Sequence, residues 1–158
     1  MKIGVIGAGY VGLTAAACLA EVGHHVCCAD NDLTKLERLN RDEMPVFEPH
    51  LGDLVARNRG EGRLEFGLPE QVITDCQALF ICVGTPLGDS GEVDLSAVDA
   101  VASLIVRMAQ GYRIVIQKST VPVGSCRKLA ESLQKSAADG RRNGLSPHWD
   151  VVANPEFL

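Results

Sequence analysis

The sequence predicts an α/β protein with a doubly wound parallel sheet of about six strands and helices on both faces, in three layers. Strand-like and helix-like apolar patterns alternate along all 158 residues. The first strand pattern runs directly into a glycine-rich turn, Gly7-x-Gly9-x-x-Gly12. The run Ala78–Val83 is continuously apolar, which is typical of a parallel strand covered on both faces. Because no repeat or low-complexity linker interrupts this alternation, we expect a single domain over residues 1–158.

The predicted strands are six short apolar runs, and the predicted helices are the longer segments between them. The strands are residues 1–6, His25–Asp30, Leu64–Phe66, Ala78–Val83, Arg113–Gln117 and Trp149–Ala153. The helices are the stretch after the glycine turn, Leu33–Leu39, Leu51–Asn58, Leu95–Ala109 and Ser125–Ala138. Asp94 is placed to cap the fourth helix, and the polar stretch 139–148 is predicted to be a flexible loop. By analogy with other proteins that carry this glycine turn, the strand order should be 3-2-1-4-5-6.

Composition excludes several classes of protein. The chain is 46% hydrophobic, and its apolar runs are too short to cross a bilayer, so neither a membrane span nor a secretory signal is expected. A net charge of −5 with dispersed basic residues argues against nucleic acid. The six cysteines form no CxxC pair and the four histidines lack metal spacing, so we expect buried reduced thiols, a cytoplasmic protein and no metal.

The glycine turn predicts a dinucleotide site. Gly7 permits the tight turn from strand to helix, Gly9 lets the main chain approach a pyrophosphate, and Gly12 allows close packing of the helix on the strand. The phosphates would then lie at a helix N-terminus, where unpaired amides and the positive end of the helix dipole stabilise them.

Asp30 is the predicted ligand of the adenosine ribose, because it ends the second strand and follows Gly12 at the expected distance in sequence. The alternative is a surface aspartate that caps the next helix, although Asn31 or Asp32 could do that instead. A carboxylate here would repel the 2′-phosphate of NADP by about 1 kcal/mol in water and about 4 kcal/mol near a protein surface. We therefore predict NAD as the cofactor, with Lys35 softening the preference.

Small polar residues follow three further strands at the edge where a ligand of such a sheet binds. Thr85, Ser119 and Thr120 offer hydroxyls next to prolines, and Glu156 is the one carboxylate of the last loop. Each could instead be ordinary turn chemistry, and Glu156 an ordinary exposed acid. Their recurrence after successive strands favours a role in the site, where Glu156 could orient a water or a substrate hydroxyl.

Five segments resemble, in order and spacing, the cofactor domain of the UDP-glucose/GDP-mannose dehydrogenase family. They are Gly7–Gly12, Pro45–Pro49, Val83–Pro86, Lys118–Gly124 and Asn154–Leu158. The family oxidises a sugar C6 alcohol to a carboxylate in two NAD-dependent steps through a cysteine-bound intermediate. The resemblance implies a UDP-glucose 6-dehydrogenase that forms UDP-glucuronate for polysaccharide biosynthesis and assembles as a homo-oligomer.

The resemblance also implies roles for individual residues. The cofactor would lie against Gly7, Ala8, Gly9, Tyr10, Val11, Gly12, Asp30, Lys35, Val83, Gly84, Thr85, Pro86, Ser119 and Thr120. Gly84 carries no weight, because the family varies there. Thr120 and Glu156 would be the catalytic pair that positions the hydrolytic water and the sugar.

The family's cysteine nucleophile, central helix and nucleotide-sugar domain have no counterpart in residues 1–158. We therefore expect this chain to bind NAD with little or no turnover. A GDP-mannose or UDP-N-acetylmannosamine dehydrogenase and a free-standing NAD sensor remain alternative interpretations. A sensor would not need the Ser119-Thr120 pair or the last loop.

Overall fold

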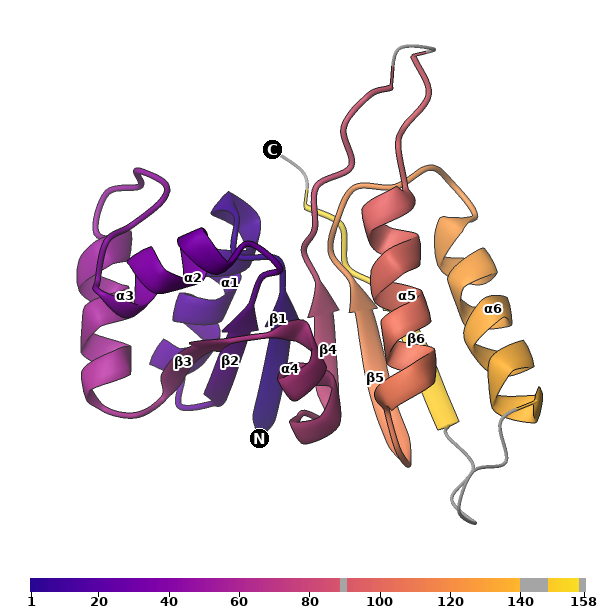
Figure 1. The fold of residues 1–158 in the computed structure, drawn as a ribbon, viewed down its shortest axis with the longest axis horizontal. Helices are drawn as coiled ribbons and strands as arrows, with labels where there is room; N and C mark the ends of the chain where they lie inside the picture. Colours follow the sequence, from indigo (N-terminus) through magenta and orange to yellow (C-terminus); the bar gives the residue numbers. More distant parts are fainter. Residues whose placement is uncertain (89–90, 140–147, 157–158) are drawn as a thin grey trace.

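The computed structural model describes residues 1–88, 91–139 and 148–156, and these form one six-stranded sheet with helices on both faces (Figure 1). The strands are β1 (Lys2–Ile6), β2 (His25–Ala29), β3 (Leu64–Gly67), β4 (Ala78–Ile81), β5 (Tyr112–Gln117) and β6 (His148–Ala153). The helices are α1 (Tyr10–Glu21), α2 (Leu33–Asn40), α3 (Leu51–Gly60), α4 (Pro69–Asp75), α5 (Ser96–Met108) and α6 (Ser125–Asp139).

The sheet has the order β3-β2-β1-β4-β5-β6, and every strand pair is parallel. This confirms the predicted doubly wound fold and strand order. Since β1 and β4 are neighbours in the sheet but distant in the chain, the order reverses between them, and a crevice opens above their carboxyl ends. The segment that joins β4 to α5 extends beyond this edge of the sheet (Figure 1).

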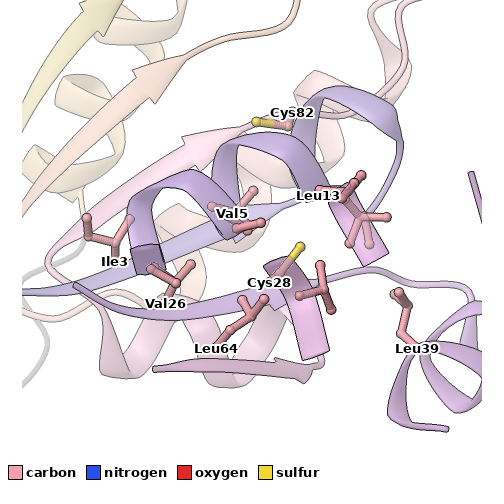
Figure 2. Close-up of a cluster of buried hydrophobic side chains, with 14 of the residues drawn as sticks. Ile3, Val5, Leu13, Val26, Cys28, Leu39, Leu64 and Cys82 are labelled. Carbon is pink, nitrogen blue, oxygen red and sulfur yellow. The ribbon is translucent and has the colours of Figure 1, made fainter. Parts of the chain in front are cut away.

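Two apolar layers enclose the sheet. One lies under α1 and α3, where side chains of β1, β2 and β3 meet Leu13 of α1 and Leu39 of α2 (Figure 2). The other lies under α4, α5 and α6, where Ile81 and Val115 of the sheet pack against Ile105 and Leu133. The three predicted layers are therefore present.

Element ends differ from the prediction by one or two residues. Helix α5 begins at Ser96 rather than Leu95, because the Asp94 carboxylate accepts the Ser96 amide hydrogen bond from outside the helix. Strand β4 ends at Ile81 rather than Val83, where the Ile81 carbonyl accepts from the amides of Lys118 and Ser119. Most of the predicted flexible loop, residues 140–147, lies outside the described residues.

Helix α4 was not among the predicted elements. It is only seven residues long and starts with Pro69 at its first position, which is a helix-start signal. It packs on the sheet at Gly4, where an added Cβ would lie 2.2 Å from Cγ1 of Val72. The absence of a side chain at Gly4 therefore lets the crossover helix lie directly on the central strand.

Replacing Gly4 by alanine is expected to destabilise the protein by about 1–3 kcal/mol, because overpacking a tight core forces side chains off their rotamers. The β-branched Val72 has little freedom to move away. Thermal or urea unfolding measures the effect. Gly60→Ala is the control, since its added Cβ would have no atom within 4 Å and it lies in helix α3. Equal stability of the two variants would contradict this account.

His50 precedes α3 in the left-handed conformation, with φ 67°, and its side chain makes no capping hydrogen bond. A side chain in this region costs about 1–2 kcal/mol, whereas glycine adopts it freely but gains unfolded-state entropy. His50→Gly is therefore expected to stabilise the protein by about 0.5–1 kcal/mol. His50→Ala keeps the strain and removes the imidazole, so unfolding of that variant should show no gain.

Candidate cofactor site

The glycine turn links β1 to α1 in a space that admits no side chain at two of its positions. Gly7 has φ 109°, and a Cβ there would lie 2.5 Å from the Cys82 carbonyl oxygen. At Gly12 a Cβ would lie 1.7 Å from the carbonyl oxygen of Gly7. Both clashes are with main-chain atoms, which cannot rotate away as a flexible side chain can. Gly7 and Gly12 therefore hold the helix against β1 and β4.

Gly9 differs from its two neighbours in the motif. It has φ −85° and ψ −167°, which any residue adopts, and an added Cβ would meet no protein atom within 4 Å. The fold therefore does not require glycine at this position. Helix α1 also lacks an acidic residue in its first turn and a side-chain cap. Open space beside uncapped helix amides suits a bound pyrophosphate, so these residues fit the dinucleotide that the sequence predicts.

Asp30 follows β2 and is only 7% exposed. Its Oδ2 accepts hydrogen bonds from the Ala8 amide at 2.8 Å and from Lys35 Nζ at 2.7 Å, and its Oδ1 accepts from the Asp32 amide. Burial alone would raise the pKa of the Asp30 carboxyl, but the Lys35 ammonium and the two amides outweigh it and lower that pKa. The carboxylate is therefore ionised at neutral pH, and it ties the glycine turn to the end of β2.

The alternative role of Asp30, as the cap of the next helix, is filled by Asp32. Asp32 is the N-cap residue of α2, and its Oδ1 accepts from the Lys35 amide at 3.1 Å. Asp30 is therefore not the cap of α2, and it lines the cavity described next.

A cavity of about 700 Å³ opens at the carboxyl ends of β1, β2 and β4, a size typical of ligand sites. Six residues that the sequence predicts for the cofactor line it. They are Gly7, Gly9, Asp30, Lys35, Val83 and Gly84. The structure thus brings the glycine turn, the acidic residue and the loop after β4 to one place.

The sequence did not predict the residues that form the other wall of the cavity, across from the glycine turn. This wall consists of the start of α4 and one face of α5. These residues are Leu68, Pro69, Glu70, Ala97, Ala100, Val101 and Leu104. The spacing of the α5 residues, at positions 97, 100, 101 and 104, is that of one helix face, and small side chains on it were the available signal.

The predicted hydroxyls lie on loops that are joined to one another. Thr85 Oγ1 donates to the Thr120 carbonyl at 2.9 Å, and Ser119 Oγ donates to the Val83 carbonyl at 2.6 Å. The loops after β4 and β5 are therefore held side by side. Ser119 is buried, and its only hydroxyl proton is shared with main-chain carbonyls, whereas Thr120 is exposed.

Glu156 lies beyond β6, and within the described residues its Oε2 is buried without a hydrogen-bond partner. Its negative charge contributes to raising the pKa of two groups near the glycine turn. Burial is the main cause of the raised pKa of the Cys82 thiol, about 12, and Glu156 adds to it. For Tyr10 the hydrogen bond to Glu48 is the main cause of the raised pKa, and Glu156 contributes less. Glu156 therefore lies near enough to Tyr10 and Cys82 for its charge to affect both groups.

Other kinds of site find no support in the described part of the chain. Residues 1–88, 91–139 and 148–156 contain no cluster of three or more potential metal ligands. Across those same ranges, no helix is long and apolar enough to span a bilayer. Of the six cysteines expected to be buried, Cys27, Cys28, Cys76 and Cys82 are buried, whereas Cys126 is partly buried and Cys18 is exposed.

A doubly wound parallel sheet, a glycine turn that leaves helix amides open, and an ionised acid at the end of β2 define a dinucleotide-binding domain. A profile of the UDP-glucose/GDP-mannose dehydrogenase family, NAD-binding domain, matches residues 1–158. The chain belongs to this family, as its NAD-binding domain.

Individual relatives agree with this assignment. UDP-glucose 6-dehydrogenase TuaD of Bacillus subtilis is 43% identical over 99% of this chain and 33% of that protein. The structure of GDP-mannose dehydrogenase from Pseudomonas aeruginosa superposes with a TM-score of 0.88 at 32% identity, over 100% of this chain and 36% of the other. UDP-glucose dehydrogenase from Pyrobaculum islandicum also has a TM-score of 0.88, at 33% identity, over 99% of this chain and 36% of the other. The chain thus spans about a third of the length of these relatives.

Proposed function

We propose that this chain is the cofactor domain of an NAD-dependent nucleotide-sugar 6-dehydrogenase that oxidises UDP-glucose to UDP-glucuronate with two NAD. The observation that carries the proposal is the open space at Gly9 beside uncapped amides of α1, with Asp30 at the neighbouring strand end. Several relatives with the whole chain aligned are UDP-glucose 6-dehydrogenases. NAD, when bound, accepts the hydride.

The cofactor half of the proposal assigns each group a task. The amides of Gly9, Tyr10 and Val11 hold the pyrophosphate, and the Asp30 carboxylate accepts hydrogen bonds from the adenosine ribose hydroxyls. Lys35 balances the charge of Asp30. Residues 83–86 would line the cofactor, and of these Val83 and Gly84 line the cavity. Ser119 would contact the cofactor as well, and its hydroxyl also holds the loops after β4 and β5 together.

The catalytic half of the proposal rests on Thr120 and Glu156. Thr120 is exposed at the loop after β5, and Oε2 of Glu156, which has no hydrogen-bond partner among the described residues, can accept a proton or a hydrogen bond. Together they would orient the hydrolytic water and the sugar. This role agrees with their place beyond β5 and β6 at the carboxyl edge of the sheet.

The four buried cysteines of this chain do not suit the nucleophile that the family resemblance implies. Burial raises the pKa of Cys27 and Cys82 to about 12 and that of Cys76 to about 11, and it also raises the pKa of Cys28 well above its ordinary value. These groups stay protonated and unreactive at neutral pH. We therefore propose that residues 1–158 bind NAD without oxidising a nucleotide sugar.

A second substrate is supported by one observation. The GDP-mannose dehydrogenase structure superposes as well as the UDP-glucose dehydrogenase structure does, at nearly the same identity. The cofactor domain alone thus does not discriminate between the two sugars. The whole protein, assayed with UDP-glucose, GDP-mannose and UDP-N-acetylmannosamine in turn, would decide between them.

The proposal extends to the setting of the whole protein. Four buried thiols fit a reducing compartment such as the cytoplasm. The family resemblance favours a homo-oligomer, which light scattering of the whole protein would test.

Calorimetric titration of the 158-residue chain tests the cofactor assignment. We expect saturable binding of NAD, weaker binding of NADP, and no NADH absorbance when UDP-glucose is added. Absence of NAD binding by folded protein would refute the proposed function. NADH production would refute the claim that these cysteines are unreactive.

A further inference from the structure

The segment Pro45–Pro49 lies beside the glycine turn, and none of the roles above uses it. Val46 packs against the core and Glu48 is partly buried, whereas Phe47 between them is 91% exposed. The Glu48 carboxylate accepts a hydrogen bond at 3.0 Å from the hydroxyl of Tyr10. Tyr10 is the first residue of α1. An acidic side chain is therefore tethered next to the helix end proposed to bind pyrophosphate.

The N-terminus of α1 attracts a carboxylate at this place. The N-terminus of α1 carries the positive end of the helix dipole and unpaired amides, which attract any nearby anion. The N-cap residue Gly9 has no side chain to bond those amides, and the first turn of α1 contains no acidic residue. A glutamate that reached them would compete with the phosphates of a dinucleotide.

The tyrosine side chain separates the carboxylate from the amides. The hydroxyl lies at the far end of the ring from the main chain, so a carboxylate bound to it is kept a full side-chain length from the Tyr10 amide. Glu48 raises the pKa of the Tyr10 hydroxyl, which therefore stays protonated and keeps donating at neutral pH. The Tyr10 carbonyl also accepts from Thr14 Oγ1 at 2.8 Å, one turn further along α1.

We infer that Tyr10 is a positioning residue that holds Glu48 away from the N-terminus of α1 and so keeps the anion site open for the cofactor's pyrophosphate. This inference rests on the proposed function, because it assumes that a dinucleotide binds there. The Pro45–Pro49 segment thus affects cofactor affinity through the charge of Glu48.

A double-mutant cycle on NAD affinity tests the inference, with wild type, Tyr10→Phe, Glu48→Gln and the double variant titrated by calorimetry. In Tyr10→Phe the freed carboxylate should weaken NAD binding about two- to fivefold, the range that a charge at a helix end produces. Glu48→Gln keeps an acceptor for Tyr10 and lacks the charge, so its affinity should equal or slightly exceed that of wild type. Adding Glu48→Gln to Tyr10→Phe should restore the affinity.

Salt dependence separates competition by charge from a merely structural effect. The ratio of wild-type to Tyr10→Phe affinity should fall toward one as sodium chloride rises, because salt screens the freed carboxylate. Tyr112→Phe is the matched control, since Tyr112 also donates to a carboxylate, Asp150 Oδ2 at 2.7 Å, from a half-exposed position on β5. That variant should bind NAD like wild type.

Two results would overturn the inference while leaving the proposed function intact. One is wild-type affinity in Tyr10→Phe. The other is a double variant that stays as weak as Tyr10→Phe, which would mean that the tyrosine acts through packing and not through Glu48. Failure of the wild-type chain itself to bind NAD would instead reject the proposed function.

Discussion

Replacing Gly12 by alanine is expected to abolish NAD binding and to destabilise the fold by about 3 kcal/mol or more, since severe overpacking is among the largest single-residue effects. The added Cβ would lie 1.7 Å from the Gly7 carbonyl oxygen and 3.3 Å from Cβ of Cys82. Helix α1 would have to move away from β1, and the turn that presents its amides would move with it. Thermal unfolding should show a fall of about 6–12 °C for a chain of this length.

Gly9→Ala is the matched control three residues earlier. Its Cβ meets no protein atom within 4 Å and its backbone suits alanine, so the melting temperature should stay near that of wild type. NAD affinity should nevertheless fall, because the methyl group occupies space that the pyrophosphate needs. A Gly9→Ala variant that binds NAD normally would contradict the placement of the phosphates. A Gly12→Ala variant as stable as wild type would contradict the packing account.

Replacing Asp30 by serine is expected to shift the NAD-to-NADP affinity ratio toward NADP by about ten- to a thousandfold, the discrimination that a carboxylate beside a phosphate supplies. The change removes the acceptor for the ribose hydroxyls and leaves the Lys35 ammonium unpaired, where it can bind a 2′-phosphate. Absolute NAD affinity should also fall, because the Ala8 amide loses its partner. Calorimetric titration with both cofactors measures the ratio.

Asp75→Ser is the control for this ratio. Asp75 also forms an ion pair with a lysine, Lys2, at 3.5 Å, but both side chains are about half exposed and lie at the amino end of β1. Its loss should leave the preference for NAD unchanged. An Asp30→Ser variant with the wild-type ratio would show that this carboxylate does not select the cofactor.

The parts of the site that the sequence could predict are those that depend on residues close together in the chain. Gly7, Gly9 and Gly12 fall within one turn, and Asp30 ends the strand that pairs with the first, so spacing along the chain was sufficient to identify them. The opposite wall could not be found in this way. Ala97 and Ala100 of α5 face the cavity only because the crossover places α5 over the sheet beside β4, and their small size alone does not show what that helix face lies against.

Helix α4 shows the same limit in the fold. Its seven residues are too few for a clear helical period, and its stability depends on packing against Gly4 of a strand more than sixty residues earlier. The Tyr10–Glu48 hydrogen bond likewise joins residues 38 apart in sequence. Such contacts depend on how distant segments meet, which no local pattern encodes.

The sequence by itself determined the fold class, the strand order, the dinucleotide turn and the acidic residue that accompanies it. The physical reason is that strand and helix periods, turn glycines and the right-handed crossover each depend on short stretches of chain. Only the tertiary structure decided which glycines are required by packing and which one leaves room for a ligand. It also decided that Asp32, and not Asp30, caps α2, and that the Tyr10 hydroxyl donates to Glu48 from the first residue of α1. These outcomes depend on distances between atoms of separate elements, which exist only once the sheet and its helices have assembled.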